Sequence, residues 1–386
     1  MTEHEAYVAL NMVPAMGGTT ARAGIAAFGS AARFLEAGAG EIASLRGVGR
    51  VRAGAFREAF QTVDPQGEIA KAASCAVRIL TPDEPDWPKA LLSIPGPPLA
   101  LYVAGSVEAL ASSCVAIVGT RGPTPYGREC ARNFAYRLAQ AGCCIVSGLA
   151  RGVDTEAAEG ALLAKGRTVA FIGSALDRLY PPENKGLARR IVASGGAVVS
   201  EYPFGRGADK QTFPMRNRLI SGLSLGVVCI EAGPASGTLI TADHALAQGR
   251  PVMALPGRVT DPAAQGCHRL IKNGARLVES PEEVLDEISS LPAFAPAPAF
   301  APAPAAATAA APAPAREAAP PARPQPKLSP EERKIVAALE DCGEAPADLL
   351  VAKAAIPAKT VGPLLVSLEM KCVVRRGATG LYSLRK

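Results

Sequence analysis

The residues best suited to chemistry are Gly119-Thr120-Arg121, which directly follow the apolar run Val115–Val118. A glycine-containing turn between a buried strand and a helix exposes backbone N–H groups and the positive end of the helix dipole, and the arginine adds a bidentate cation. These residues predict a phosphate-binding turn; an ordinary tight turn, which needs no arginine, is the alternative. NAD binding is disfavoured because the GxGxxG fingerprint is missing and because Ser147-Gly148, rather than an acid, ends the next strand.

Similar loops follow the other apolar runs of this part of the chain. The candidate phosphate-binding residues are Gly119, Thr120, Arg121, Ser147, Gly148, Lys185, Arg216, Asn217, Arg218, Ser236, Gly237 and Thr238. If the strands are parallel, these loops converge on one edge of the sheet. One anion needs one such loop, whereas several basic loops suit a run of phosphates, that is, a polynucleotide. For Arg216 and Arg218, the alternative is that one of them pairs with Glu201 or Glu231.

Strands and helices in alternation must position these loops. The expected strands are Val115–Val118, Cys144–Val146, Thr168–Ile172, Ala197–Val199, Val227–Ile230 and Pro251–Leu255. The expected helices are Gly127–Ala141, Thr155–Ala164, Asn184–Ala193 and Thr241–Gln248. Continuous apolar runs of this kind are typical of strands buried on both faces, so residues 71–290 predict an α/β, doubly wound parallel sheet.

The flanking segments differ in composition. Residues 1–70 show helical spacing, and Leu45-Arg46-Gly47-Val48-Gly49 is similar to a helix-hairpin-helix turn, which could serve packing or DNA contact. Residues 291–327 repeat Ala-Pro and predict a semi-rigid linker. Residues 328–386 predict three helices and a two-stranded hairpin, the pattern of a winged helix, for which DNA binding and protein docking both stay open.

Composition excludes several classes of protein. The 386 residues carry 41 Lys+Arg and 35 Asp+Glu, a net charge of +6 that permits an anionic partner without requiring one. The nine cysteines form no CxxC pair, which argues against a zinc site and a disulfide framework and fits a reducing cytoplasm. The N-terminal segment lacks the pattern of a signal peptide, and the longest uncharged stretch is too rich in proline for a membrane helix.

The central motifs resemble one known family. They are the run from Val115 to Asp154 and the segments YPPENK, SEYPFG, FPMRNRLISGLS, EAGPASGTLITADHAL, GRPVMALPG and GCHRLIKNGA. Over residues 77–285 the chain resembles the DNA-processing protein A family (DprA, also called Smf). The resemblance implies an extended Rossmann-like fold, with a small all-α N-terminal domain similar to sterile-alpha-motif or helix-hairpin-helix domains and a winged-helix C-terminal domain.

The resemblance also implies a function. The family binds single-stranded DNA, forms homodimers, protects incoming DNA and loads the RecA recombinase during natural transformation. It implies that Arg121 and Lys185 are the basic DNA-binding positions, and that the helix Ala242–Gln248 borders the recombinase-docking face. The residues implied at the dimer interface are Cys267, His268, Leu270 and Ile271. Thr120 replaces a serine that is frequent in the family, and the long Ala-Pro linker is unusual.

Two other functions compete with this one. The segment Glu231–Thr238 is similar to the PGGxGT loop of lysine-decarboxylase-like nucleotide hydrolases, but here Asp243 and His244 follow where those enzymes need a glutamate. With three histidines, no hydrolase dyad or metal cluster emerges from spacing, so we expect no catalysis, metal or cofactor. A hub that recruits partners through its C-terminal segments is the third hypothesis. Aromatic residues are scarce, and Tyr126 and Phe213 are the local candidates for base stacking.

Overall fold

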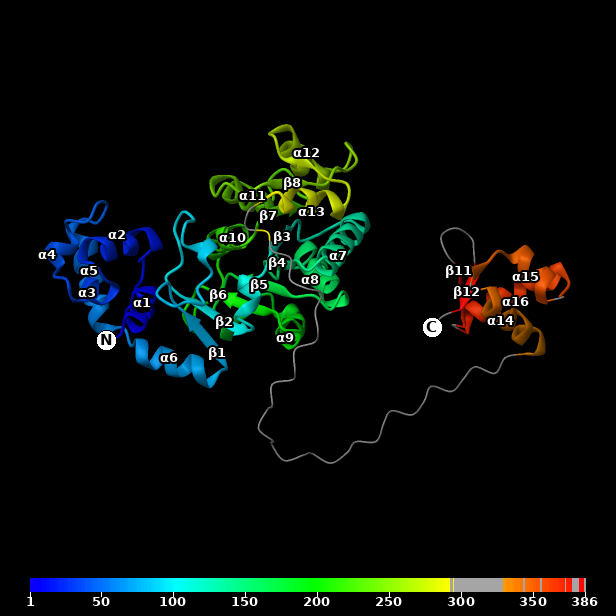
Figure 1. The fold of residues 1–386 in the computed structure, drawn as a ribbon, viewed down its shortest axis with the longest axis horizontal. Helices are drawn as coiled ribbons and strands as arrows, with labels where there is room; N and C mark the ends of the chain where they lie inside the picture. Colours follow the sequence, from blue (N-terminus) through cyan, green and yellow to red (C-terminus); the bar gives the residue numbers. More distant parts are fainter. Residues whose placement is uncertain are drawn as a thin grey trace, which may run out of the picture. The chain divides into compact units, whose positions relative to one another are not determined.

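The computed structural model describes residues 1–291, 294, 329–342, 344–354, 356–371, 373–376 and 382–384. The chain forms two compact units, one within Met1–Ala305 and one within Ala306–Lys386 (Figure 1). The predicted Ala-Pro linker lies outside the described residues except for Leu291 and Phe294. Within the part of the chain that is described, no helix is both long and apolar enough to cross a membrane.

The first unit is built on a nine-stranded sheet with the order β1-β2-β6-β5-β4-β3-β7-β8-β9. The strands are β1 (Val77–Leu80), β2 (Leu101–Gly105), β3 (Cys114–Val118), β4 (Cys144–Ser147), β5 (Thr168–Ile172), β6 (Ala197–Ser200), β7 (Gly226–Cys229), β8 (Val252–Ala254) and β9 (Arg276–Leu277). The strands from β6 to β9 are parallel, whereas β1 and β2 pair antiparallel at one side. The predicted doubly wound α/β fold is confirmed, and β1, β2 and β9 extend the sheet beyond the six expected strands.

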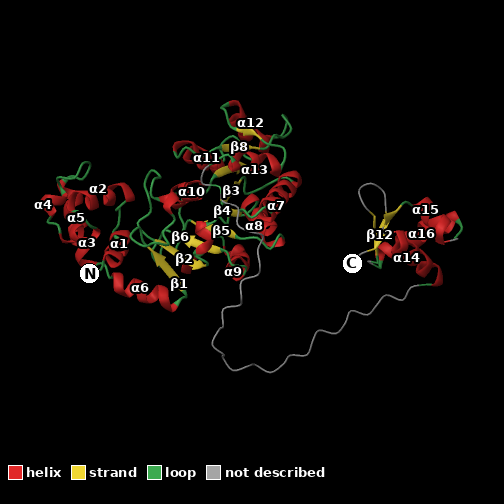
Figure 2. Ribbon diagram, in the orientation of Figure 1, coloured by secondary structure: helices red, strands yellow, loops and turns green. Residues whose placement is uncertain are grey.

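Helices cover both faces of the sheet (Figure 2). They are α7 (Pro125–Gln140), α8 (Val153–Leu163), α9 (Lys185–Ala193), α10 (Thr212–Leu223), α11 (Gly237–Ala247), α12 (Gln265–Lys272) and α13 (Pro281–Ser289). Helices α7, α8 and α13 bury one apolar core against the sheet, and α10, α11 and α12 bury another on the opposite face. Burial on both faces explains why the parallel strands read as continuous apolar runs.

The expectation of a loop at residues 213–218 is wrong, because this segment forms the first half of α10. Pro214 was a loop signal in the sequence. It lies in the first turn of the helix, where a missing backbone N–H costs no hydrogen bond.

The N-terminal part of the first unit is all-α. Its helices are α1 (Glu3–Met12), α2 (Gly18–Phe28), α3 (Ala31–Glu36), α4 (Ala39–Ile42), α5 (Arg50–Thr62) and α6 (Pro65–Ser74). Phe34 is fully buried at its centre, stacked on Phe28 and edge-on to Phe60. The Asn11 amide donates to the backbone oxygen of Glu201 at 3.0 Å, which ties α1 to the loop after β6. The boundary predicted at residue 70 falls inside α6.

The second unit is a winged helix, as the sequence predicts. It contains α14 (Pro330–Cys342), α15 (Ala347–Ala354), α16 (Ala358–Met370) and a sheet of β10 (Glu344–Ala345), β11 (Val374–Arg376) and β12 (Tyr382–Leu384) in the order β10-β12-β11. The Ser329 hydroxyl accepts from the Glu332 backbone N–H at 3.1 Å, and the Glu332 carboxylate accepts from the Ser329 N–H at 2.7 Å. This reciprocal pair is a capping box, with Ser329 as the N-cap of α14.

The pH dependence of this unit follows from Glu332, which is buried and whose carboxylate accepts from Lys371 Nζ at 2.7 Å. Hydrogen bonds from Lys371, Ser329 and Ser367 lower the pKa of Glu332 to about 2. Because the folded state binds this proton more weakly than the unfolded state, the stabilisation is complete above the unfolded pKa and is lost as the pH falls toward 2. Glu332→Gln should destabilise the unit at neutral pH by about 1–3 kcal/mol and flatten its pH dependence.

Calorimetry of the full chain at several pH values would measure this change. The control is Glu331→Gln, which removes the same charge from the exposed neighbouring residue. An equal loss of stability in both variants would contradict the assignment.

Candidate functional site

The strand order reverses between β3 and β7, and in doubly wound sheets the loops at the carboxyl ends of two such strands border a crevice where ligands bind. The chain leaves β3 toward β4, β5 and β6, then returns to β7 on the other side of β3 and continues to β8 and β9. Helices therefore leave these two neighbouring strands in opposite directions, and their following loops separate. The Thr120 N–H donates to the backbone oxygen of Glu231 at 2.8 Å, which joins the two loops at the base of the crevice.

Glu231 organises the Gly-Thr-Arg turn. Its buried carboxylate accepts from the Thr124 N–H at 2.9 Å and from the Thr124 hydroxyl at 2.5 Å. Thr124 in turn caps α7 by accepting from the Gly127 N–H at 3.1 Å. A Cβ on Gly127 would lie 2.2 Å from Oε2 of Glu231. The first turn of α7 can therefore approach this carboxylate so closely only because residue 127 is a glycine. Glu231 is thus a positioning group for the turn and not a partner of Arg216 or Arg218.

Arg216 holds the ends of two strands from inside the protein. Its guanidinium is 4% exposed and donates to the backbone oxygens of Gly148, at 2.6 Å, and Phe171. Asp154, also buried, accepts from the N–H groups of Gly148 at 3.0 Å and Ala150 at 3.2 Å. Burial lowers the pKa of Arg216 to about 10, and burial raises the pKa of Asp154 while the nearby Arg216 opposes that rise. The two groups thus fix the loop after β4, Arg216 through a backbone oxygen and Asp154 through two backbone N–H groups.

The guanidinium of Arg218 is also bonded to groups within the protein. Its guanidinium lies 2.5 Å from Oε1 of Glu201 and donates to the backbone oxygens of Gly96 at 2.8 Å and Met215 at 2.9 Å. The pairing with Glu201, one of the two alternatives from sequence, is therefore observed. A phosphate at Arg216 or Arg218 would have to displace bonds that the folded protein already makes.

Arg121 is presented differently, on the surface. Its guanidinium lies 5.0 Å from the ring centre of Phe213, and that ring meets the Tyr180 ring at 5.8 Å in an edge-to-face contact. Arg151 donates to the Tyr180 hydroxyl at 3.5 Å. Tyr180 is 39% exposed and is the aromatic residue that sequence reasoning missed; its place in YPPENK, shortly after a strand, was the available signal. The four side chains come from three different loops and from the start of α10.

The other predicted residues surround this group. Lys185 is exposed at the first residue of α9, whereas Ser147 is buried at the end of β4. Asn217 bonds to Arg216 and donates to the Gly237 oxygen at 3.4 Å. Ser236, Gly237 and Thr238 form the cap and first turn of α11, which begins four residues earlier than expected, and the Ser236 hydroxyl accepts from the Thr238 N–H. Lys210, exposed just before α10, is a basic residue that sequence reasoning overlooked.

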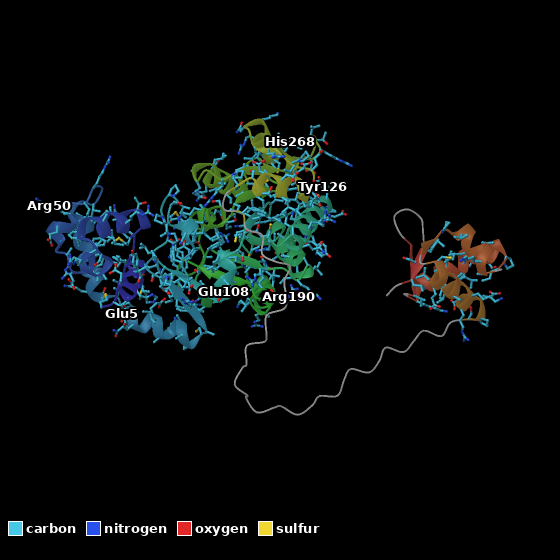
Figure 3. All side chains as sticks on the ribbon, in the orientation of Figure 1. Glu5, Arg50, Glu108, Tyr126, Arg190 and His268 are labelled. Carbon is cyan, nitrogen blue, oxygen red and sulfur yellow. The ribbon has the colours of Figure 1, made fainter. Side chains whose placement is uncertain are left out.

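The residues implied at the dimer interface lie on α12, and Tyr126 lies in the first turn of α7. Cys267 and Leu270 are buried in the core of the first unit, and Ile271 is half-buried. His268 Nε2 lies 3.1 Å from the Gly257 oxygen, and the hydroxyl of Tyr126 donates to the adjacent Pro256 oxygen at 3.4 Å. Figure 3 shows Tyr126 and His268 near each other. His268 and Ile271 alone of the four keep exposed surface, and their role in a dimer stays a prediction.

Comparison with known protein families gives two matches. The model for DNA recombination-mediator protein A matches residues 78–289, and the model for the DprA winged helix domain matches residues 319–379.

Curated relatives match the same part of the chain. Protein Smf of Synechocystis sp. is 42% identical over 219 residues, which are 56% of this chain and 55% of that protein. The DNA processing protein DprA of Bacillus subtilis is 41% identical over 52% of this chain and 68% of its own. A putative DNA processing protein DprA of Mycobacterium tuberculosis is 32% identical over 75% of this chain and 72% of its own. The chain thus spans about half the length of the Smf relative and more of the other two.

Two solved structures are similar as well. DNA processing protein A (DprA) from Streptococcus pneumoniae superimposes with a TM-score of 0.64 at 33% identity, covering 74% of this chain and 98% of that one. DNA processing protein A from Helicobacter pylori, described for its unique single-stranded DNA binding mode, has a TM-score of 0.50 at 32% identity, covering 55% and 96%.

The close approach of Arg216 to the loop after β4 requires glycine at position 148. A Cβ on Gly148 would lie 2.5 Å from Nη1 of Arg216, whereas a Cβ on Gly122 would have no atom within 4 Å. Gly148→Ala should therefore destabilise the first unit by about 1–3 kcal/mol through overpacking, and Gly122→Ala should change its stability little. Urea unfolding of the full chain measures both variants. Equal stability of Gly148→Ala and the native protein would contradict the described packing.

Proposed function

The chain belongs to the DNA recombination-mediator protein A family, and on that premise we propose that it binds single-stranded DNA at the carboxyl edge of its parallel sheet. The observation that carries the proposal is the surface group of Arg121, Phe213 and Tyr180. It combines a cation for phosphate with aromatic rings for bases, which are the two elements that single-strand binders use. The Helicobacter relative, described for its single-stranded DNA binding mode, supports the same ligand.

The geometry of this group suits an unpaired strand. The Phe213 ring supports the Arg121 guanidinium by a cation–π contact, which leaves the outer side of the guanidinium open to a phosphate. Tyr180, packed against the edge of Phe213, presents exposed ring surface beside it. Base stacking is sequence-tolerant because every base has a π face, so the interface should accept strands of any sequence.

Cations around this group extend it to several phosphates. Lys185 and Lys210 are exposed, and within the described ranges neither forms an ion pair. Arg151 is exposed and lies 3.9 Å from Glu183, a long and solvated contact that a phosphate can replace. Because these side chains belong to loops that follow different β-strands, the interface can follow a DNA strand across the sheet edge. Its affinity for DNA should fall with salt, because the contacts are to phosphates.

The wider role that we propose is recombination mediation. The family's description supports it, and the protein would protect incoming single strands and load RecA during transformation, as a homodimer in the cytoplasm. The expected recombinase-docking helix, Ala242–Gln248, largely coincides with α11, where Leu246 is 59% exposed and Ile240 38% exposed. Exposed apolar side chains of this kind are suited to contact with another protein.

We further propose that the protein acts without catalysis. Glu231 and Asp154, the buried acids nearest the crevice, are occupied by backbone N–H groups and by Thr124. His244 is half-buried on α11, and burial lowers its pKa, so it stays neutral near pH 7 and packs against the protein. These contacts support structural roles for the two buried acids and for His244, one of the two residues that the hydrolase alternative would need.

Hydrolysis can be tested directly. Purified protein incubated with each nucleoside monophosphate should release no free base above the level of a protein-free control, as measured by chromatography. Release of base that disappears in Asp243→Asn, a change at the exposed acid that follows the Gly-Thr pair, would support the hydrolase instead.

The DNA-binding proposal predicts the effect of two basic side chains. Arg121→Ala with Lys185→Ala should weaken binding to oligo-dT by about tenfold or more. It should also reduce the slope of log affinity against log salt by about 1.4, because two phosphate contacts on a single strand are lost. Fluorescence anisotropy at several salt concentrations measures both quantities.

The matched control removes the same charge elsewhere. Arg137, in the last turn of α7, and Arg276, the first residue of β9, are also exposed and pair with Glu282 and Glu287. Both lie toward the amino ends of the parallel strands, the edge opposite the proposed DNA interface. Arg137→Ala with Arg276→Ala should leave affinity and salt slope nearly unchanged. The proposal fails if the two double variants bind oligo-dT equally.

A further inference from the structure

A groove of about 550 Å³ lies on the sheet face between α6 and α9, away from the Gly-Thr-Arg turn. Its floor consists of Val77 on β1, Ala104 on β2 and Val198 on β6. Helix α9 forms one wall with Ala188 and Val192, and Phe204 and the turn that holds Leu176 and Leu179 contribute the other sides. Figure 1 shows β1 and β2 between α6 and α9.

The hollow follows from strand register and side-chain size. Val77 pairs with Ala104, and Ala104 pairs with Val198, so the three side chains form one row on one face of the sheet. The smallest side chain is at the centre of the row. Helix α6 packs on β1 and α9 packs on β6, and neither covers the middle strand completely, because Ala104 stays half-buried.

The rim of the groove on α9 is cationic. Lys185 and Arg189 both line it, four residues apart on the same side of α9, and both are exposed. Neither makes an ion pair within the described part of the chain. The acid on the opposite rim, Asp177, is engaged by the Gly205 N–H at 2.9 Å and by Lys71 at 3.6 Å. An apolar cleft with free cations along one rim is complementary to a ligand that joins a flat, weakly polar body to an anion.

The groove is continuous with the proposed DNA interface. Lys185 belongs to both, and Leu179, which lines the groove, directly precedes Tyr180. From Tyr180 the contacts continue to Phe213 and then to Arg121. A strand held at Arg121 can therefore pass over Tyr180 and reach the mouth of the groove at Lys185.

We propose that this groove receives an unstacked nucleobase of the bound single strand, with Lys185 and Arg189 holding the adjoining phosphates. The inference rests on the proposed function and goes beyond it, because it assigns a base-binding pocket that is separate from the Arg121 group. The base places its flat faces against Ala104 and α9, and its polar edge stays toward the open side, where water satisfies it. Since no hydrogen-bond donor or acceptor of the floor reads that edge, the pocket takes any base.

Cys75 offers a direct probe. It is exposed and lines the groove, whereas the other cysteines in the described ranges are buried or half-buried. In the full chain, saturating oligo-dT should slow the alkylation of Cys75 by about fivefold or more, as followed by peptide mass mapping. An abasic oligonucleotide of equal length, also at saturation, should slow it little, because it supplies phosphates without a base.

Side chains that fill the groove should weaken binding of oligo-dT but not of the abasic oligonucleotide. Ala104→Leu fills the floor, and Ala193→Leu narrows the wall from an exposed position on α9 where folding is not at risk. Each should weaken binding of oligo-dT by about 5- to 150-fold, the range for the loss of one base contact of 1–3 kcal/mol, and leave binding of the abasic oligonucleotide unchanged. Ala55→Leu, the same exchange on an exposed position of α5, is the control and should bind as the native protein does.

The outcomes separate this inference from the function on which it rests. If the native protein binds oligo-dT but Cys75 stays equally reactive and both groove variants bind normally, the base pocket is wrong and the DNA interface stands. Protection of Cys75 by the abasic oligonucleotide as strongly as by oligo-dT also overturns the pocket, because backbone alone would then cover the groove. If oligo-dT does not bind the native protein, the proposed function itself fails.

Discussion

The buried guanidinium of Arg216 is the interaction on which the carboxyl edge of the sheet depends. It joins the first half of α10 to the loop after β4 and to the end of β5, and it lies opposite a buried carboxylate, Asp154, that binds the same loop. A charge this deep in the protein is tolerated only when its hydrogen bonds are made and an opposite charge is near. Arg216 meets both conditions, so removing the Asp154 carboxylate would leave a buried charge without its nearby counter-charge.

At this edge of the sheet, the charged side chains that hold the loops in place are different from those that are exposed to a ligand. Beneath the surface, the charged groups of Glu231, Asp154, Arg216 and Arg218 are bonded to backbone groups, to Thr124 or to Glu201. Above them, Arg121, Lys185 and Lys210 stay exposed, with aromatic rings between them. Buried side chains whose hydrogen bonds are all made within the protein hold the loops in place and do not compete with the exposed cations for a phosphate. Exposed cations on long side chains can then follow an irregular polymer.

The two antiparallel strands at the side of the sheet add a second kind of surface. Because β1 and β2 lack the intervening helices that cover parallel strands, the sheet face there is closed only by α6 and α9, which leave a groove between them. The cationic side of α9 borders this groove and begins at Lys185, a residue of the crevice edge. A doubly wound sheet with this extension thus has a cationic edge and an adjoining apolar hollow.

Much of this protein is determined by its sequence alone. Continuous apolar runs and the helical segments between them predict six of the first unit's seven parallel strands to within about a residue or two, because burial on both faces leaves a local pattern. The exposed β9 leaves no such pattern. The Gly-Thr-Arg turn and Lys185 are found for the same reason: a strand end followed by a helix start is a local arrangement. The motifs also carry the family resemblance, which family models confirm over residues 78–289 and 319–379.

Tertiary structure alone decided which cations are free. Arg216 and Arg218 are adjacent to Asn217 in one basic run, yet their partners lie 68 residues away at Gly148 and 17 residues away at Glu201. Tyr180 reaches Phe213, 33 residues further along the chain, only because a loop and the start of α10 converge at the sheet edge. The groove depends on the pairing of β2 with β6, which is not its neighbour in the sequence, and on the register of both with β1. Burial and pairing are set by contacts between distant segments, so a local pattern of residues cannot specify them.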